Sequence, residues 1–394
     1  MRSDPRRAGA AALAAVLVAS WGLGCAKLNY PDEGVGPGHD ETHAGPQSHV
    51  ATAHDARAWV RHSAEGREQM RIRDYSAAEQ SYLAALAETG AFPVHDARVR
   101  TALGNLIRLA AARQAQSEWD DADRLIERVV LNADNGRLAD FGSAAPVMAR
   151  QAMYRARRGN PDGAIELYET SLTLYGVTDP SQIATRLDIE SLLGNTYLSI
   201  GRFDDAERLL QSVLRGVRSL AGPESVAASL AQIDVARLDD ATGDFDGAES
   251  GYRAALAIQQ KQVPGSLELA KTQSKIAWFY LEHGRNEEAA QHAAAAVASF
   301  DDRNVTGAPL IAVLDTLATA EARLGRNDLA EADYSRALAL YDESDAQTRT
   351  SLVELLDHFA EFERSRGRGP NAESLSDRAN RERAATVAGA APAE

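Results

Sequence analysis

The chain of 394 residues contains one cysteine, Cys25, so it offers almost no thiol chemistry. Other catalytic signatures are also missing: there is no GxSxG nucleophile elbow, no HExxH metal motif and no phosphate-binding Walker loop. The glycine-rich stretch Gly34–Gly38 lacks the flanking strand and helix that a dinucleotide site requires. We therefore expect no enzymatic activity and no cofactor, because a fold carries chemistry only where a site for it exists.

Basic charge is scarce as well. The chain has 42 Lys and Arg residues against 57 Asp and Glu residues, and its formal net charge at pH 7 is −15. This acidity argues against nucleic acid as a partner and weakly favours a basic protein segment. No run of six like charges occurs, so we expect the charge to be spread over solvated helix faces. Nothing in the sequence indicates a small-molecule substrate.

The N-terminus carries a targeting pattern. Arg2, Arg6 and Arg7 precede an apolar run from Ala8 to Ser20, which is typical of a bacterial export signal. The run is too short to span a bilayer comfortably, so a retained transmembrane anchor is the lesser alternative. We expect residues 1–24 to be a signal peptide.

Cys25 follows Gly24 at the end of this pattern and resembles the modified cysteine of bacterial lipoproteins. The resemblance implies that Cys25 carries a diacylglyceryl group and becomes the mature N-terminus. The lipobox usually has Leu three residues before the cysteine, where this chain has Gly22. The alternative is ordinary signal-peptidase cleavage after Gly22–Gly24, which would release a soluble periplasmic protein. Ala26 after the cysteine implies an outer-membrane anchor facing the periplasm, if the host is Gram-negative.

Residues 25–50 are rich in Pro, Gly, His and Asp and lack apolar periodicity, which predicts a flexible tether. Five histidines lie in or near it: His39, His43, His49, His54 and His62. The His39–His43 spacing superficially resembles a zincin motif, but no Glu directly follows the first His and no helix is predicted there. We expect no metal site, because an unstructured segment must first be ordered to coordinate a metal.

A repeat dominates the rest of the chain. Six glycines recur 41 or 42 residues apart, and an alanine follows each of them by five residues. The pairs are Gly159 and Ala164, Gly201 and Ala206, Gly243 and Ala248, Gly284 and Ala289, Gly325 and Ala330, and Gly367 and Ala372. Looser spacing extends the pattern back to Ala122 and Ala78, which gives about eight copies over residues 51–385 and leaves 386–394 as a disordered tail.

Each copy reads as two amphipathic helices joined at the glycine. Glycine can adopt the left-handed conformation that closes a helix, and alanine lets the partner helix approach closely. This pattern resembles the tetratricopeptide repeat, in a long variant similar to kinesin-light-chain arrays. The resemblance implies an all-α, right-handed superhelical solenoid of helix-turn-helix repeats. Copies one and two depart from it, with Arg73 and Ser117 at the glycine position, and copy eight looks like a degraded capping repeat.

The resemblance also implies a binding surface, since the first helix of each tetratricopeptide unit lines the concave groove. Family contact positions map onto Met153, Asn195, Leu198, Ile233, Arg237, Trp278 and Thr319. Asn195, Arg237 and Trp278 share one position in three successive copies and offer an amide, a fixed charge and an aromatic anchor. Each also has a structural interpretation: Arg237 can pair with Asp234 or Asp240, and Trp278 can pack between repeats.

We therefore expect a scaffold that binds a peptide or helical segment of another protein, displayed from the bacterial cell envelope through a lipid on Cys25. Stacked repeats of this kind normally bind rather than catalyse. Two alternatives stay open: an accessory or regulatory subunit of an envelope enzyme or of secretion or pilus machinery, and a soluble periplasmic binding protein.

Overall fold

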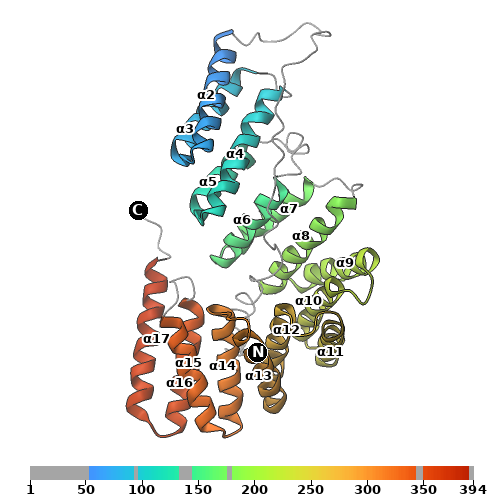
Figure 1. Cartoon of the computed structure of the whole chain (residues 1–394), viewed down its shortest axis with the longest axis vertical. Helices are drawn as coiled ribbons and strands as arrows, with labels where there is room; N and C mark the ends of the chain where they lie inside the picture. Colours follow the sequence, from blue (N-terminus) through green and yellow to red (C-terminus); the bar gives the residue numbers. More distant parts are fainter. Residues whose placement is uncertain (1–52, 93–95, 133–143, 175–179, 343–348, 390–394) are drawn as a thin grey trace. The chain divides into compact units, whose positions relative to one another are not determined.

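The computed structural model describes residues 53–92, 96–132, 144–174, 180–342 and 349–389. Within these ranges every regular element is helical, as Figure 1 shows, and the predicted all-α class is confirmed. The predicted signal peptide and tether, including Cys25, lie outside the described residues. The last helix continues to Gly389, beyond the predicted end of the array at residue 385.

The chain divides into two compact units, with the boundary between Thr196 and Tyr197. The described part of the N-terminal unit contains α2 (Ala53–Arg71), α3 (Tyr75–Glu88), η1 (Thr89–Ala91), α4 (Ala97–Ala115), α5 (Trp119–Asn132), α6 (Ala145–Arg157), α7 (Pro161–Thr173) and most of α8 (Pro180–Ser199). The helices pack as consecutive hairpins, α2 with α3, α4 with α5 and α6 with α7. The first helices of neighbouring hairpins are also in contact, α2 with α4 and α4 with α6.

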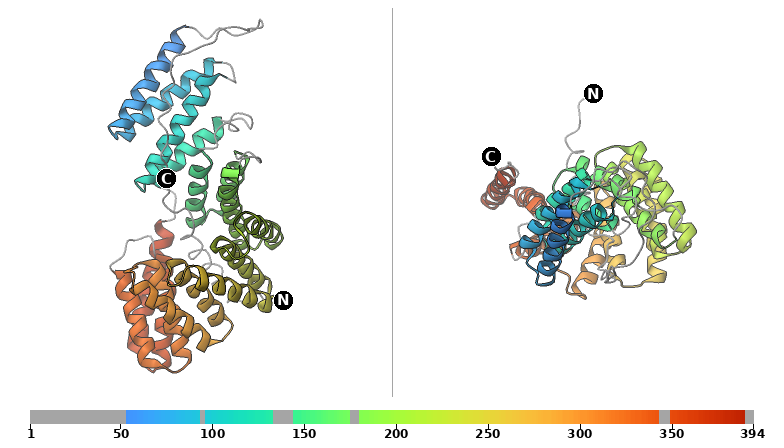
Figure 2. Two further views of the ribbon diagram at one scale, coloured as in Figure 1. Left: turned by 45° about the vertical axis from the view of Figure 1, so that its right-hand side comes forward. Right: turned by 90° about the horizontal axis from the view of Figure 1, so that it is seen from above.

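The C-terminal unit repeats this arrangement. It contains α9 (Phe203–Ala221), α10 (Val226–Thr242), α11 (Phe245–Gln262), α12 (Leu267–Glu282), α13 (Asn286–Asp301), α14 (Ala308–Arg323), α15 (Asn327–Asp342), α16 (Arg349–Ser365) and α17 (Gly369–Gly389). Hairpins form between α10 and α11, α12 and α13, α14 and α15, and α16 and α17. Figure 2 shows α14 to α17, in orange and red, lying side by side.

The turn inside each hairpin explains the repeated glycine. At Gly201 the backbone has φ 76°, and the amides of Gly201 and Arg202 donate to the carbonyls of Leu198 and Tyr197. This is a Schellman closure, which needs a left-handed residue after the helix. Arg73 and Ser117 adopt the same conformation, with φ of 62° and 64°. Copies one and two therefore keep the turn although they lack the glycine.

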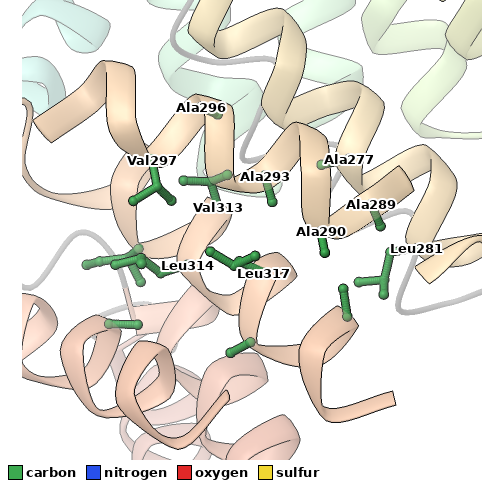
Figure 3. Packing of buried hydrophobic residues seen from close by; sticks show 14 of the residues in the cluster. Ala277, Leu281, Ala289, Ala290, Ala293, Ala296, Val297, Val313, Leu314 and Leu317 are labelled. Carbon is green, nitrogen blue, oxygen red and sulfur yellow. The ribbon is translucent and has the colours of Figure 1, made fainter. Parts of the chain in front are cut away.

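The repeated alanine is buried where two helices of a hairpin pack together. Ala289 on α13 has no exposed surface, and Figure 3 shows it beside Ala277 and Leu281 of α12. Small side chains on α13 face larger ones, such as Leu317 on α14, so the two helices can pack closely. The equivalent alanines Ala164, Ala206, Ala248 and Ala330 are fully buried as well. Packing of this kind holds the first helices in a fixed register.

The final hairpin ends the packed core. On α17, Ala372 and Ala379 are buried against the rest of the unit, whereas Ser374 and Asp377 are exposed. A polar outer face lets a repeat array end in water without leaving an open apolar layer. The polar residues of copy eight therefore fit a capping role.

Candidate protein-binding faces on the first helices

The first helices of the C-terminal unit are α10, α12, α14 and α16, and polar contacts tie each to the next. His283, at the C-terminal end of α12, lies 2.7 Å from the Asp240 carboxylate of α10. Arg323 of α14 donates to the Leu281 carbonyl of α12 at 2.9 Å. His358 of α16 lies 2.9 Å from the Asp315 carboxylate of α14. Polar side-chain contacts therefore connect the four first helices along one face.

Arg237 and Trp278 are the two predicted contact residues in this unit that combine a functional group with some exposure. The Arg237 side chain is 12% exposed and lies 3.9 Å from Asp234, so the pairing that the sequence allowed is present. Trp278 is partly exposed. Lys271 and Lys275 lie on α12 at helical spacings that place them on the face of Trp278. We call Asp234, Arg237, Lys271, Lys275 and Trp278 the tryptophan patch.

Lys275 gives the tryptophan patch an unusual charge. It is 8% exposed, and burial followed by the nearby Arg237 lowers the pKa of its ammonium group to about 7, against the attraction of Asp234. The position is equivalent to Asp234 in the preceding repeat. Lys275 was not among the predicted contact residues, although its register on the inner helix face could have identified it.

A second polar cluster lies on α14 and α16. The Asp315 carboxylate raises the pKa of His358 to about 9, so this imidazole is a cation at neutral pH. Burial raises the pKa of Glu354, one turn earlier on α16, to about 7. The structure places Asp315 in an ion pair between repeats.

Three other predicted contact residues of the C-terminal unit are part of its packed framework. Ile233 is 1% exposed and belongs to the hydrophobic core, and Leu198 is 8% exposed. Thr319 is also 8% exposed, and its hydroxyl lies 2.9 Å from the Tyr334 hydroxyl. As packed, these residues support the first helices and present little surface to a partner.

In the N-terminal unit, Asn195 is 4% exposed and its amide donates to the Ser191 carbonyl at 2.9 Å, one turn earlier on α8. Met153 on α6 is partly exposed. Family register thus selects the correct helix face, but only Met153, Arg237 and Trp278 among the seven nominated residues keep appreciable accessible surface.

No group of three or more His, Cys, Asp or Glu side chains in the described ranges could hold a metal ion. His39, His43 and His49 lie outside those ranges, and His62 lies 3.4 Å from Glu65 on α2. None of the described helices is both long and apolar enough to cross a membrane.

Comparison with known proteins identifies the repeat. Residues 185–261 match the tetratricopeptide repeat family model. No curated protein sequence matches the chain. Among solved structures, a Rap protein complexed with competence and sporulation factor is 12% identical with a TM-score of 0.50, covering 84% of this chain and 99% of its own.

Two further structures show lower structural similarity. BtubC from P. vanneervenii is 22% identical with a TM-score of 0.49, over 60% of this chain and 93% of its own. A tetratricopeptide repeat protein from Parabacteroides merdae is 16% identical with a TM-score of 0.46, over 76% of this chain and 98% of its own. The family match at residues 185–261, with the hairpins, left-handed turns and buried alanines that repeat on both sides of it, shows that this chain carries tetratricopeptide repeats.

Proposed function

We propose that this protein is a non-enzymatic scaffold that binds a segment of another protein on the first-helix faces of its repeats. The observation that carries the proposal is the tryptophan patch, where a partly exposed indole lies on the same face as three basic side chains. Large aromatic and arginine side chains contribute most to protein–protein binding when a partner covers them. A peptide or helical segment with an apolar anchor and a carboxylate would match this patch.

The proposal can be tested by site-specific photo-crosslinking in cells. A photoreactive amino acid at position 278 should give a discrete adduct with one or a few proteins. The same probe at the exposed Arg215 position of α9, on a second helix, is the matched control. Arg237→Gln should reduce the adduct at position 278 while the thermal melting curve stays unchanged. Equal adducts at both positions, or none at 278, would remove the tryptophan patch from the binding surface.

The proposed location is the bacterial cell envelope, with a lipid on Cys25 as the anchor. The arginines and apolar run before Cys25 support it, and acyl chains bind membranes with about 0.8 kcal/mol per buried CH₂. Mass spectrometry of the N-terminal peptide, with Cys25→Ala as the control, tests this location. A diacylglyceryl mass on Cys25 and release of the Cys25→Ala protein from membranes are expected. An unmodified thiol at the mature N-terminus would support the soluble periplasmic alternative.

A further inference from the structure

Two successive first helices in the N-terminal unit carry no acidic residue, although the whole chain has a net charge of −15. Their basic residues are Arg98, Arg100, Arg108 and Arg113 on α4, and Arg150, Arg155 and Arg157 on α6. In the C-terminal unit, by contrast, α10 and α16 both contain more acidic than basic residues. Charge is therefore segregated between first helices along the chain.

Three of these arginines are neutralised within the unit. Arg98 pairs with Asp96 at 2.6 Å, Arg113 with Glu118 at 2.6 Å, and Arg155 with Asp123 at 2.8 Å. These contacts hold α4 and α6 against adjacent segments and explain why the three arginines are present. The carboxylates in these pairs all come from outside α4 and α6.

Arg108, Arg150 and Arg157 differ, because none of them makes an ion pair within the described ranges. Arg108 donates to the Asn105 side chain, and Arg150 donates to the Gln114 Oε1 atom at 3.1 Å. Both acceptors are neutral amides. Arg108 and Arg157 are exposed and Arg150 is partly exposed, so a partner can reach these residues, although burial lowers the pKa of the Arg157 guanidinium group. A guanidinium group that is left without a carboxylate keeps its capacity for a bidentate contact.

These side chains lie along one side of the stacked first helices. Arg108 and Arg150 are 42 residues apart and so occupy one position in successive repeats. The Arg150 contact to Gln114 crosses from α6 to α4. The exposed Arg67 on α2 lies on this side as well. Burial raises the pKa of Tyr82, and the positive charges of Arg67 and Arg108 both oppose this rise, so both lie near the Tyr82 hydroxyl. We call Arg67, Arg108, Arg150 and Arg157 the arginine row.

We infer that the arginine row binds an acidic protein segment, laid across α2, α4 and α6 with its carboxylates facing the guanidinium groups. This inference rests on the proposed scaffold function and specifies the chemistry of one partner. Neighbouring helix axes lie about 8–10 Å apart and an extended chain advances about 3.3 Å per residue, so matching carboxylates are about three residues apart. The acidity of the whole chain weakly favours a basic partner, but the local charge on this face reverses that expectation.

A protein segment fits better than a nucleic acid or a lipid surface. The row is narrow and the chain around it is acidic, so an extended polyanion would bring phosphates against carboxylates outside the row. A peptide can confine its charges to the positions that face the arginines.

Arg128 provides a control residue for this inference. It lies on the second helix α5, is exposed, makes no ion pair within the described ranges and lies away from the first-helix face.

Fluorescence anisotropy on the full chain tests the inference. The probe is a labelled synthetic peptide with Glu at every third position, and a Lys-for-Glu peptide is its counterpart. The Glu peptide should bind, and added salt should weaken its binding because the contacts are charged. The double variant Arg108→Gln and Arg150→Gln should lose roughly tenfold in affinity, whereas Arg128→Gln should match the parent protein. Circular dichroism melting of each variant checks that it remains folded.

Three results would contradict the inference or its assignment to a protein partner. Equal affinities for the double variant and Arg128→Gln, or preference for the Lys peptide, would overturn the inference. Tighter binding of a single-stranded oligonucleotide or of phosphatidylglycerol vesicles than of the Glu peptide would overturn the assignment to a protein. Crosslinking at position 278 tests the scaffold function separately, so an adduct there combined with failure at the arginine row would contradict only this inference.

Discussion

The turn residue of the second repeat allows a direct test of why glycine recurs in this protein. Ser117 has φ 64°, whereas five of the six repeated glycines take the same position with φ between 72° and 77° and Gly243 with φ 90°. A left-handed backbone costs a residue with a side chain about 1–2 kcal/mol. Replacing serine by glycine removes this cost, but glycine also raises the entropy of the unfolded chain, which offsets about 0.4–1 kcal/mol of the gain. Ser117→Gly should therefore stabilise the protein by about 0.5–1 kcal/mol.

The reciprocal change should have the opposite sign. A side chain at Gly325 would meet no atom within 4 Å, so the cost of Gly325→Ser is conformational and not steric. It should destabilise the protein by a similar amount, about 0.5–1 kcal/mol. Ser212→Gly on the exposed face of α9 is the control, because glycine inside a helix should cost roughly 0.5 kcal/mol.

Thermal melting and native-state hydrogen exchange measure these effects. A change of 1 kcal/mol shifts the melting temperature by about 2–4 °C in a unit of about 200 residues. Because repeats couple mainly to their neighbours, amides of α4 and α5 should gain the most protection in Ser117→Gly. The reasoning is refuted if Ser117→Gly and Ser212→Gly change stability in the same direction, or if Gly325→Ser is neutral.

Two further predictions concern the core. Ala289→Leu should destabilise the C-terminal unit by about 1–3 kcal/mol, because Ala289 is fully buried at the α12–α13 contact, and an unchanged urea midpoint would contradict this. Burial, followed by the nearby Asp333, raises the pKa of Glu321 to about 7, so its protonated form stabilises the fold at acidic pH and this stabilisation is lost as pH rises through about 7. Glu321→Gln should flatten the fall in melting temperature between about pH 5 and about pH 8, and a parallel curve would contradict the assignment.

Several features of this protein followed from local sequence pattern alone. The glycine spacing predicted where each hairpin turns, because a left-handed residue is needed directly after a helix wherever the Schellman closure forms. The alanine five residues later predicted a buried position against the partner helix, and Ala248 and Ala330 are fully buried. Both are properties of one hairpin, and so they repeat wherever the hairpin repeats. Arg73 and Ser117 depart from the glycine pattern in sequence, but their backbone follows the same rule.

Exposure of the candidate contact residues could not be predicted in this way. Family register placed Ile233, Arg237 and Thr319 together on the first-helix face, yet Ile233 and Thr319 are buried by neighbouring helices. A position in a repeat specifies which way a side chain points. How much of it remains accessible depends on the size and tilt of the next helix, which the pattern does not encode.

Charge pairing required the tertiary structure most of all. Arg108 and Arg113 lie on the same helix, α4, and composition does not distinguish them. Arg113 reaches Glu118, directly before the following helix, and Glu79 on α3, whereas the side-chain bond of Arg108 among the described residues goes to a neutral amide. Whether an arginine of a first helix forms an ion pair depends on which second helix packs against it and which carboxylates that helix carries. The sequence therefore determined the repeat and its turns, and the packing of one hairpin on the next determined which charges remain available for a partner.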